Sequence, residues 1–186
     1  MCIRDRYYKG IFTTLSSCAS RQLEEVTFRR ATISVPELMA TAGKYFRKVY
    51  KGNKAHIDFK IQLLEGRITG DWNQLRFLLE NLIDEACSVT LDGAVCLSAR
   101  EDGEFIRFLF TDMRREKTRE ELNQLFYPDL SRMTAGEKGE LYGTEYLVCK
   151  QIIRDHDEFA GRRGCRINAE PGKEGGFTIY FTLPKK

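Results

Sequence analysis

One stretch decides the fold, GDWNQLRFLLENLIDEACSV at residues 70–89. Its apolar residues recur at helical spacing, and at about 100° per residue they fall within one arc. These residues are Leu75, Leu78, Leu79, Leu82, Ala86 and Val89. The spacing predicts an amphipathic helix over residues 72–89. Asn81 and Glu85 lie one turn apart at the edge of the arc, where polar side chains either face a cleft or begin the solvated face.

Four further helices are expected along the chain. Ser34-x-x-Glu37, with Pro36 between them, has the pattern of a capping box and predicts a helix that ends at Gly52-Asn53. Residues 144–155 are amphipathic as well, and residues 114–125 predict a short, exposed, charged helix. Residues 11–25 carry a single narrow apolar stripe, which predicts one N-terminal helix that needs a partner helix.

Strand patterns alternate with these helices. Residues 56–62 alternate apolar and polar side chains, and Asp102-Gly103 joins two further strands, 94–100 and 105–111, as a hairpin. A β-leaning stretch is expected at 31–35, and two more strands at 165–169 and 177–183. This order predicts an α+β fold: a two-layer α/β sandwich with a mixed, mostly antiparallel sheet covered by helices on one face.

The composition excludes several classes of protein. The chain has 186 residues, 42% hydrophobic and 31% charged, and its net charge of +3 comes from interleaved signs, which argues against a nucleic-acid binder. Six cysteines without a C-x-x-C pair, and two histidines far apart, predict reduced thiols and no zinc site. No apolar run approaches the roughly 20 residues that a membrane span needs. We therefore expect a cytoplasmic protein.

Five segments resemble, in the same order, the C-terminal catalytic, ATP-binding domain of sensor histidine kinases. Residues 70–86 resemble its N-L-L-x-N segment, and residues 108–112 resemble the strand that ends in its D-x-G-x-G box. The other segments are residues 125–128, similar to its F-box, 150–156, which match the helix after its glycine lid, and 169–184, which match its terminal hairpin. The resemblance covers roughly residues 33–184 and implies the Bergerat ATPase fold.

The same resemblance implies ATP and Mg²⁺ as cofactors and places their ligands. Asn81 and Glu85 stand where the family holds Mg²⁺, and Asp112 stands where it accepts a hydrogen bond from the adenine amino group. Glu85 replaces an asparagine. A carboxylate can ligate Mg²⁺, but without the metal it repels the triphosphate.

Several boxes depart from the family pattern. Arg114 and Glu116 replace the two glycines after Asp112, so we expect side chains to crowd the purine pocket. In the lid, Gly143 is the one glycine that remains, followed by Thr144, and Glu145 opposes phosphate by its charge. The predicted remnant of the nucleotide site comprises six residues: Asn81, Glu85, Asp112, Arg114, Gly143 and Thr144. No catalytic residue is assigned, because the phosphoacceptor histidine would lie upstream.

Two domains are expected. Residues 1–30 would be the remnant of a dimerisation and phosphoacceptor module, its first six residues, MCIRDR, resembling a translated adapter; residues 31–186 would be the ATPase domain. The resemblance implies a homodimer formed through the N-terminal helix of the full-length protein and a response regulator or other signalling protein as partner. It implies no nucleic acid and no membrane contact for this fragment, and the full-length protein could still be membrane-anchored.

Three functions follow from these features. The first is a degenerate histidine-kinase-type domain, a pseudokinase whose nucleotide binding is weakened or lost and which acts as a regulatory or dimerisation module. The second is an active Mg-ATP-dependent kinase domain in which Glu85 binds the metal and Arg114 contacts phosphate. The third keeps the fold without any ligand, the cleft being closed by Tyr142, Tyr146 and Arg114.

Overall fold

The computed structural model describes residues 28–50, 52, 55–126, 144–173 and 175–186. Its elements, in chain order, are β1 (Ala31–Ser34), α2 (Val35–Val49), β2 (Ile57–Gln62), β3 (Arg67–Gly70), α3 (Trp72–Ser88), β4 (Gly93–Asp102), β5 (Phe105–Asp112), α4 (Arg119–Gln124), α5 (Thr144–Phe159), β6 (Ile167–Pro171) and β7 (Phe177–Pro184).

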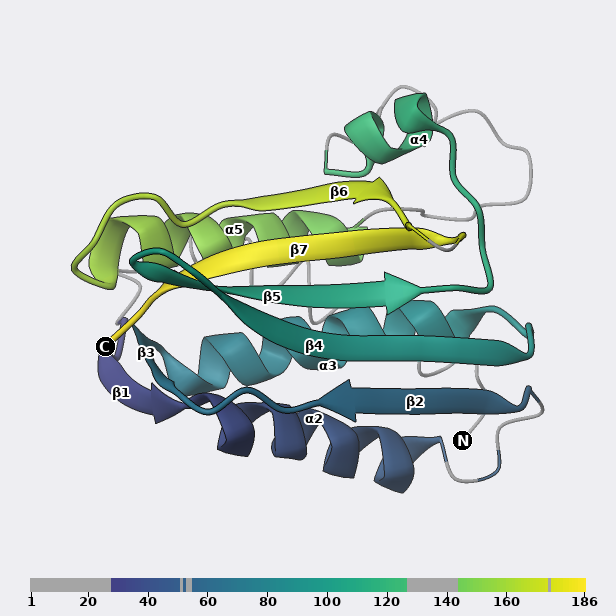
Figure 1. Cartoon of the computed structure of the whole chain (residues 1–186), viewed down its shortest axis with the longest axis horizontal. Helices are drawn as coiled ribbons and strands as arrows, with labels where there is room; N and C mark the ends of the chain where they lie inside the picture. Colours follow the sequence, from purple (N-terminus) through teal and green to yellow (C-terminus); the bar gives the residue numbers. More distant parts are fainter. Residues whose placement is uncertain (1–27, 51, 53–54, 127–143, 174) are drawn as a thin grey trace.

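Five strands form the main sheet, in the order β2-β4-β5-β7-β6. Strands β2 and β4 are parallel, and every other neighbouring pair is antiparallel. Strands β1 and β3 form a separate antiparallel pair. Helices α2, α3 and α5 lie side by side behind the main sheet, and α4 stands beyond the edge strand β6 (Figure 1). The predicted mixed, mostly antiparallel sheet with helices on one face is confirmed.

The core lies between the sheet and the three long helices. Along β5, Ile106, Phe108 and Phe110 alternate toward the helices and are at most 3% exposed. The ring of Phe108 stacks on that of Phe181 from β7, with centroids 5.0 Å apart. Because β5 is central in the sheet, its last residue is buried as deeply as its middle. This last residue of β5 is Asp112.

Most predicted elements appear, with shifted ends. The predicted start of the 114–125 helix is wrong. Helix α4 begins at Arg119, because Thr118 caps it with a complete capping box formed with Glu121. The last predicted pair of strands begins at Ile167 rather than at residue 165. The predicted helix at 11–25 lies outside the described residues.

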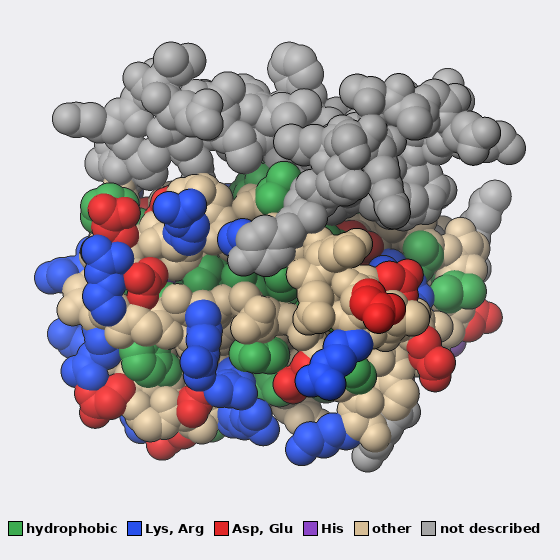
Figure 2. Space-filling view, turned by 90° about the horizontal axis from the view of Figure 1, so that it is seen from above, with side chains coloured by type: hydrophobic (Ala, Val, Ile, Leu, Met, Phe, Trp, Pro, Cys, Tyr) green, Lys and Arg blue, Asp and Glu red, His purple; other side chains and the backbone are tan. Residues whose placement is uncertain are grey.

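The surface mixes charges of both signs. On the face seen in Figure 2, the described acidic and basic side chains intermingle instead of gathering by sign. Among the described helices, none is long and apolar enough to cross a membrane.

Candidate functional site

Helix α3 carries the predicted residues Asn81 and Glu85. Its start is fixed by Asp71, whose side chain accepts the N–H of Gln74 at 3.1 Å. Asn81 is 8% exposed, and its Nδ2 donates to the carbonyl of Phe77, one turn earlier, at 3.0 Å. The amide N–H of Asn81 is thus engaged within the helix, so only its oxygen is suited to a cation.

Asp112 closes strand β5 with a buried carboxylate. In the sheet it lies opposite Val95 of β4 and Phe177 of β7, and it is 1% exposed. A buried carboxylate in this position needs charged or hydrogen-bonding partners. Both kinds of partner come from the two arginines that follow in the chain.

Arg114 turns back onto Asp112 immediately after the strand. Its Nε lies 2.9 Å from Oδ1 and its Nη2 lies 2.8 Å from Oδ2, and its backbone N–H also donates to Oδ1 at 3.0 Å. The same guanidinium donates to the carbonyl of Ala86 at 2.6 Å and to that of Leu91 at 3.1 Å. Its side chain is 1% exposed. Arg114 therefore joins the end of β5 to the C-terminal end of α3.

Arg115 bridges the two predicted carboxylates. Its Nε donates to Asp112 Oδ2 at 2.9 Å, while Nη1 and Nη2 donate to Glu85 Oε1 and Oε2 at 3.1 and 2.8 Å. The guanidinium also lies over the ring of Phe177, 5.3 Å from its centroid. We call Glu85, Asp112, Arg114 and Arg115 the arginine cluster.

The hydrogen-bonding capacity of Asp112 is filled within the arginine cluster. A carboxylate offers about four lone-pair sites. Oδ1 accepts two N–H groups of Arg114, and Oδ2 accepts one from Arg114 and one from Arg115. An adenine amino group would therefore have to displace an arginine. Both oxygens of Glu85 likewise accept from Arg115, so they are not placed for a metal.

These contacts set the protonation states in the arginine cluster. Burial alone would raise the pKa of Asp112, but the hydrogen bonds from Arg114 and the charges of both arginines outweigh it and hold that pKa below its usual value. Burial likewise opposes the charge of Arg115, yet its hydrogen bonds and ion pair with Glu85 raise its pKa. Asp112 is thus ionised at neutral pH, and Arg115 keeps its charge beside it.

Tyr146, near the start of α5, lies beside the arginine cluster. It is 3% exposed, and its ring packs edge-on against Phe126 with centroids 5.9 Å apart. Burial, followed by the neighbouring carboxylate of Glu85, raises its pKa well above the usual value. Its hydroxyl makes no hydrogen bond of good geometry among the described residues.

The structure brings together three of the six predicted site residues, Glu85, Asp112 and Arg114, through direct contacts or through Arg115. Asn81 lies one turn before Glu85 with its amide N–H turned to its own helix. Gly143 lies outside the described residues, and Thr144 begins α5 without a described side chain. Sequence reasoning placed Arg115 on an exposed helix. Two consecutive arginines directly after a buried strand-ending aspartate are the signal that could have found it.

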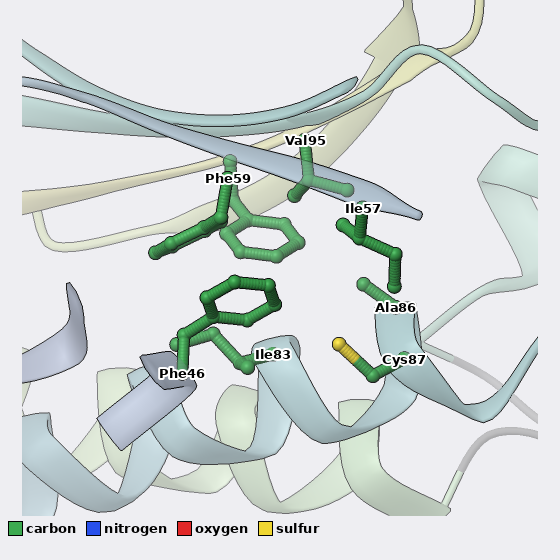
Figure 3. Close-up of a pocket in the computed structure, with 8 residues that line it drawn as sticks. Phe46, Ile57, Phe59, Ile83, Ala86, Cys87 and Val95 are labelled. Atoms are coloured by element: carbon green, nitrogen blue, oxygen red, sulfur yellow. The ribbon is translucent and has the colours of Figure 1, made fainter. Parts of the chain in front are cut away.

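The residues present do not fit the adenine and Mg²⁺ that the resemblance implies. The carboxylates of Asp112 and Glu85 are engaged by Arg114 and Arg115, and among the described residues no group of three or more His, Cys, Asp or Glu could hold a metal. Figure 3 shows a small pocket between α2, α3 and the sheet, and its interior leaves no room for a water molecule. Its lining is apolar and includes none of the predicted site residues: Phe46, Ile57, Phe59, Ile83, Ala86, Cys87, Val95 and Phe110.

The described fold is a mixed sheet backed by three helices, with Asp112 at the end of a central strand and Asn81 on helix α3. The pattern of the histidine kinase-, DNA gyrase B- and HSP90-like ATPases matches residues 70–186, and the chain belongs to this family. The resemblance read from the sequence is confirmed.

Individual relatives agree with this family. The chain is 26% identical over 176 residues to the adaptive-response sensory kinase SasA of Thermosynechococcus vestitus, and the match covers 94% of this chain and 44% of that protein. The chain thus spans less than half the length of this curated relative. The catalytic domain of histidine kinase ThkA shares the fold, with a TM-score of 0.63 and 17% identity over 84% of this chain and 98% of that one.

Longer solved structures share the fold over more of the chain. Histidine kinase AdeS of Acinetobacter baumannii has a TM-score of 0.69 and 12% identity, covering 96% of this chain and 79% of that one. Histidine kinase ThkA in complex with the response regulator protein TrrA has a TM-score of 0.73 and 16% identity, covering 98% of this chain and 49% of that chain.

Proposed function

We propose that this chain is a degenerate ATPase domain of a histidine-kinase-like signalling protein, a pseudokinase domain whose nucleotide site is filled by its own arginines. The observation that carries the proposal is the saturation of Asp112 by four N–H groups. The carboxylate that would recognise adenine is already neutralised and hydrogen-bonded. A nucleotide would gain its contact there only by breaking a buried ion pair, which costs several kcal/mol.

The contacts of Arg114 make its displacement from the predicted nucleotide site unfavourable in free energy. Besides Asp112, it satisfies the carbonyls of Ala86 and Leu91 at the end of α3. Moving it aside would remove the donor of the part-buried Ala86 carbonyl and leave Asp112 with Arg115 alone. This favours a pseudokinase over an active Mg-ATP-dependent kinase, in which Glu85 would hold the metal and Arg114 the phosphates.

A domain that binds no nucleotide would act through its contacts with other protein domains. We propose that it serves in the cytoplasm as a regulatory or dimerisation module, with residues 1–30 belonging to the module that forms a homodimer. The complex of histidine kinase ThkA with a response regulator supports a response regulator, or another signalling protein, as the partner.

Thermal unfolding with and without Mg-ATP tests the proposal. A ligand at 100 times its dissociation constant adds about 2.7 kcal/mol to the stability of the folded state. We expect the melting temperature to stay unchanged at millimolar Mg-ATP. A saturating rise that the variants Asp112→Asn and Glu85→Gln each abolish would instead show a working nucleotide site and contradict the proposal.

A further inference from the structure

We propose that residues 28–30 form a docked joint, which fixes the chain preceding the ATPase domain to the ends of helices α3 and α5. The proposal concerns a part of the molecule remote from the arginine cluster and stands whether or not nucleotide binds. It is carried by contacts that each of the three residues makes with segments far away in the sequence.

Phe28 and Arg29 contact both helices. The ring of Phe28 lies edge-on to that of His156, with centroids 4.9 Å apart, and 5.8 Å from the ring of Phe159, both on α5. The backbone N–H of Arg29 donates to Asp71 Oδ2 at 2.8 Å. Since Asp71 Oδ1 caps α3, one carboxylate holds both the helix start and the joint.

Arg30 extends the same contact to the turn that follows α5. Its Nη1 lies against Gly161, so closely that a Cβ at this glycine would come within 2.7 Å. Gly161 has a φ of +92°, a conformation that side chains disfavour. The turn therefore accommodates Arg30 at a position that glycine alone suits.

His156 is the buried support of the joint. Its Nδ1 lies 2.8 Å from the carbonyl of Ile152, which can only accept, and its Nε2 lies 3.0 Å from the backbone N–H of Asp71, which can only donate. The ring is therefore neutral, with its proton on Nδ1. It is 0% exposed, and Gly70 leaves room for it, since a Cβ there would lie 2.9 Å from Nε2.

The joint and the arginine cluster lie at opposite ends of the same helix pair. Helix α3 begins beside the joint at Asp71 and reaches the cluster at Glu85. Helix α5 runs the other way, from Tyr146 near Glu85 to His156 in the joint. Residues 28–30 are thus attached to the two helices that border the cluster.

Hydrogen exchange of single backbone amides, measured by NMR on the whole chain, tests the joint. Asp71→Asn keeps an oxygen for the α3 cap but presents an N–H group where Arg29 needs an acceptor. We expect the Arg29 amide to exchange about tenfold faster or more in this variant, while the Gln74 amide keeps its protection. Asp58→Asn, on the exposed edge strand β2, is the matched control and should change neither amide.

A second variant approaches the joint from its other side. Phe28→Ala removes the ring contacts without touching the cap, and it should also speed exchange at Arg29 while the core amide of Phe108 is unchanged. The proposal is overturned if the Arg29 amide of the unmodified chain exchanges as fast as in an unstructured peptide. It is equally overturned if both variants leave that exchange unaltered.

Discussion

Arg114 donates two parallel hydrogen bonds to Asp112, from Nε to Oδ1 at 2.9 Å and from Nη2 to Oδ2 at 2.8 Å. Both side chains are 1% exposed. Such a bidentate, fully buried pair has little net effect on stability while it is intact, because desolvation offsets the attraction. Removal of one partner leaves the other charge buried and unpaired. The pair therefore makes the end of β5 sensitive to single substitutions.

The first prediction concerns Arg114→Met. We expect this variant to lose about 3–5 kcal/mol of unfolding free energy, because Asp112 keeps only Arg115 and the carbonyls of Ala86 and Leu91 lose their donor. Urea unfolding measures the change. Arg100→Met, at an exposed position, is the control and should stay within about 0.5 kcal/mol of the unmodified chain. A loss below about 1 kcal/mol for Arg114→Met would show that the buried pair does not form.

The second prediction concerns the link between Arg115 and Glu85. Their side chains are 14% and 16% exposed and are joined by two hydrogen bonds. A double-mutant cycle with Arg115→Met and Glu85→Gln should therefore give a coupling energy of about 1–3 kcal/mol in urea unfolding. Additive effects of the two substitutions would mean that the side chains do not interact in solution.

The third prediction is a loss of stability in acid. The pKa of Asp112 is lowered in the folded state: burial opposes this, but Arg114 and Arg115 outweigh burial. Between that pKa and the unfolded value of about 3.9, the unfolded chain binds more protons. Stability from Asp112 is thus complete above the unfolded value and is lost as the pH falls through the folded one. Urea unfolding between neutral pH and about pH 3 should show the decline.

The variant Arg115→Met tests whether Asp112 is a source of this acid sensitivity. In Arg115→Met the decline should be smaller, because one of the charges that lowers the pKa of Asp112 is gone. Glu80 acts in the opposite sense, since burial raises its pKa, so its protonation favours the folded state. A stability that rises steadily on acidification would contradict the ion pairs of Asp112.

Local patterns made much of the fold predictable. The apolar arc predicted a helix over 72–89, and α3 spans Trp72–Ser88, with Asp71 as its cap. The Asp102-Gly103 turn was also found: β4 ends at Asp102, and Gly103 adopts a φ of +59° that its lack of a side chain permits. Periodicity and turn chemistry operate over a few residues, and the sequence displays them directly.

The arginine cluster was less accessible to such reasoning. Arg114 and Arg115 stand among glutamates at spacings typical of an exposed helix, and the pattern predicted one. In the structure, Thr118 delays the helix and the two arginines are drawn to the buried Asp112 instead. The direction of a side chain in a non-repetitive segment depends on which charge the tertiary structure buries nearby, and no periodicity records that.

Calorimetric titration of the chain with Mg-ATP tests the central claim most directly, because it registers nucleotide binding without relying on activity. The account predicts no saturable heat up to millimolar nucleotide, since Arg114 and Arg115 already fill the acceptor sites of Asp112. One-to-one binding tighter than about 100 μM would contradict it.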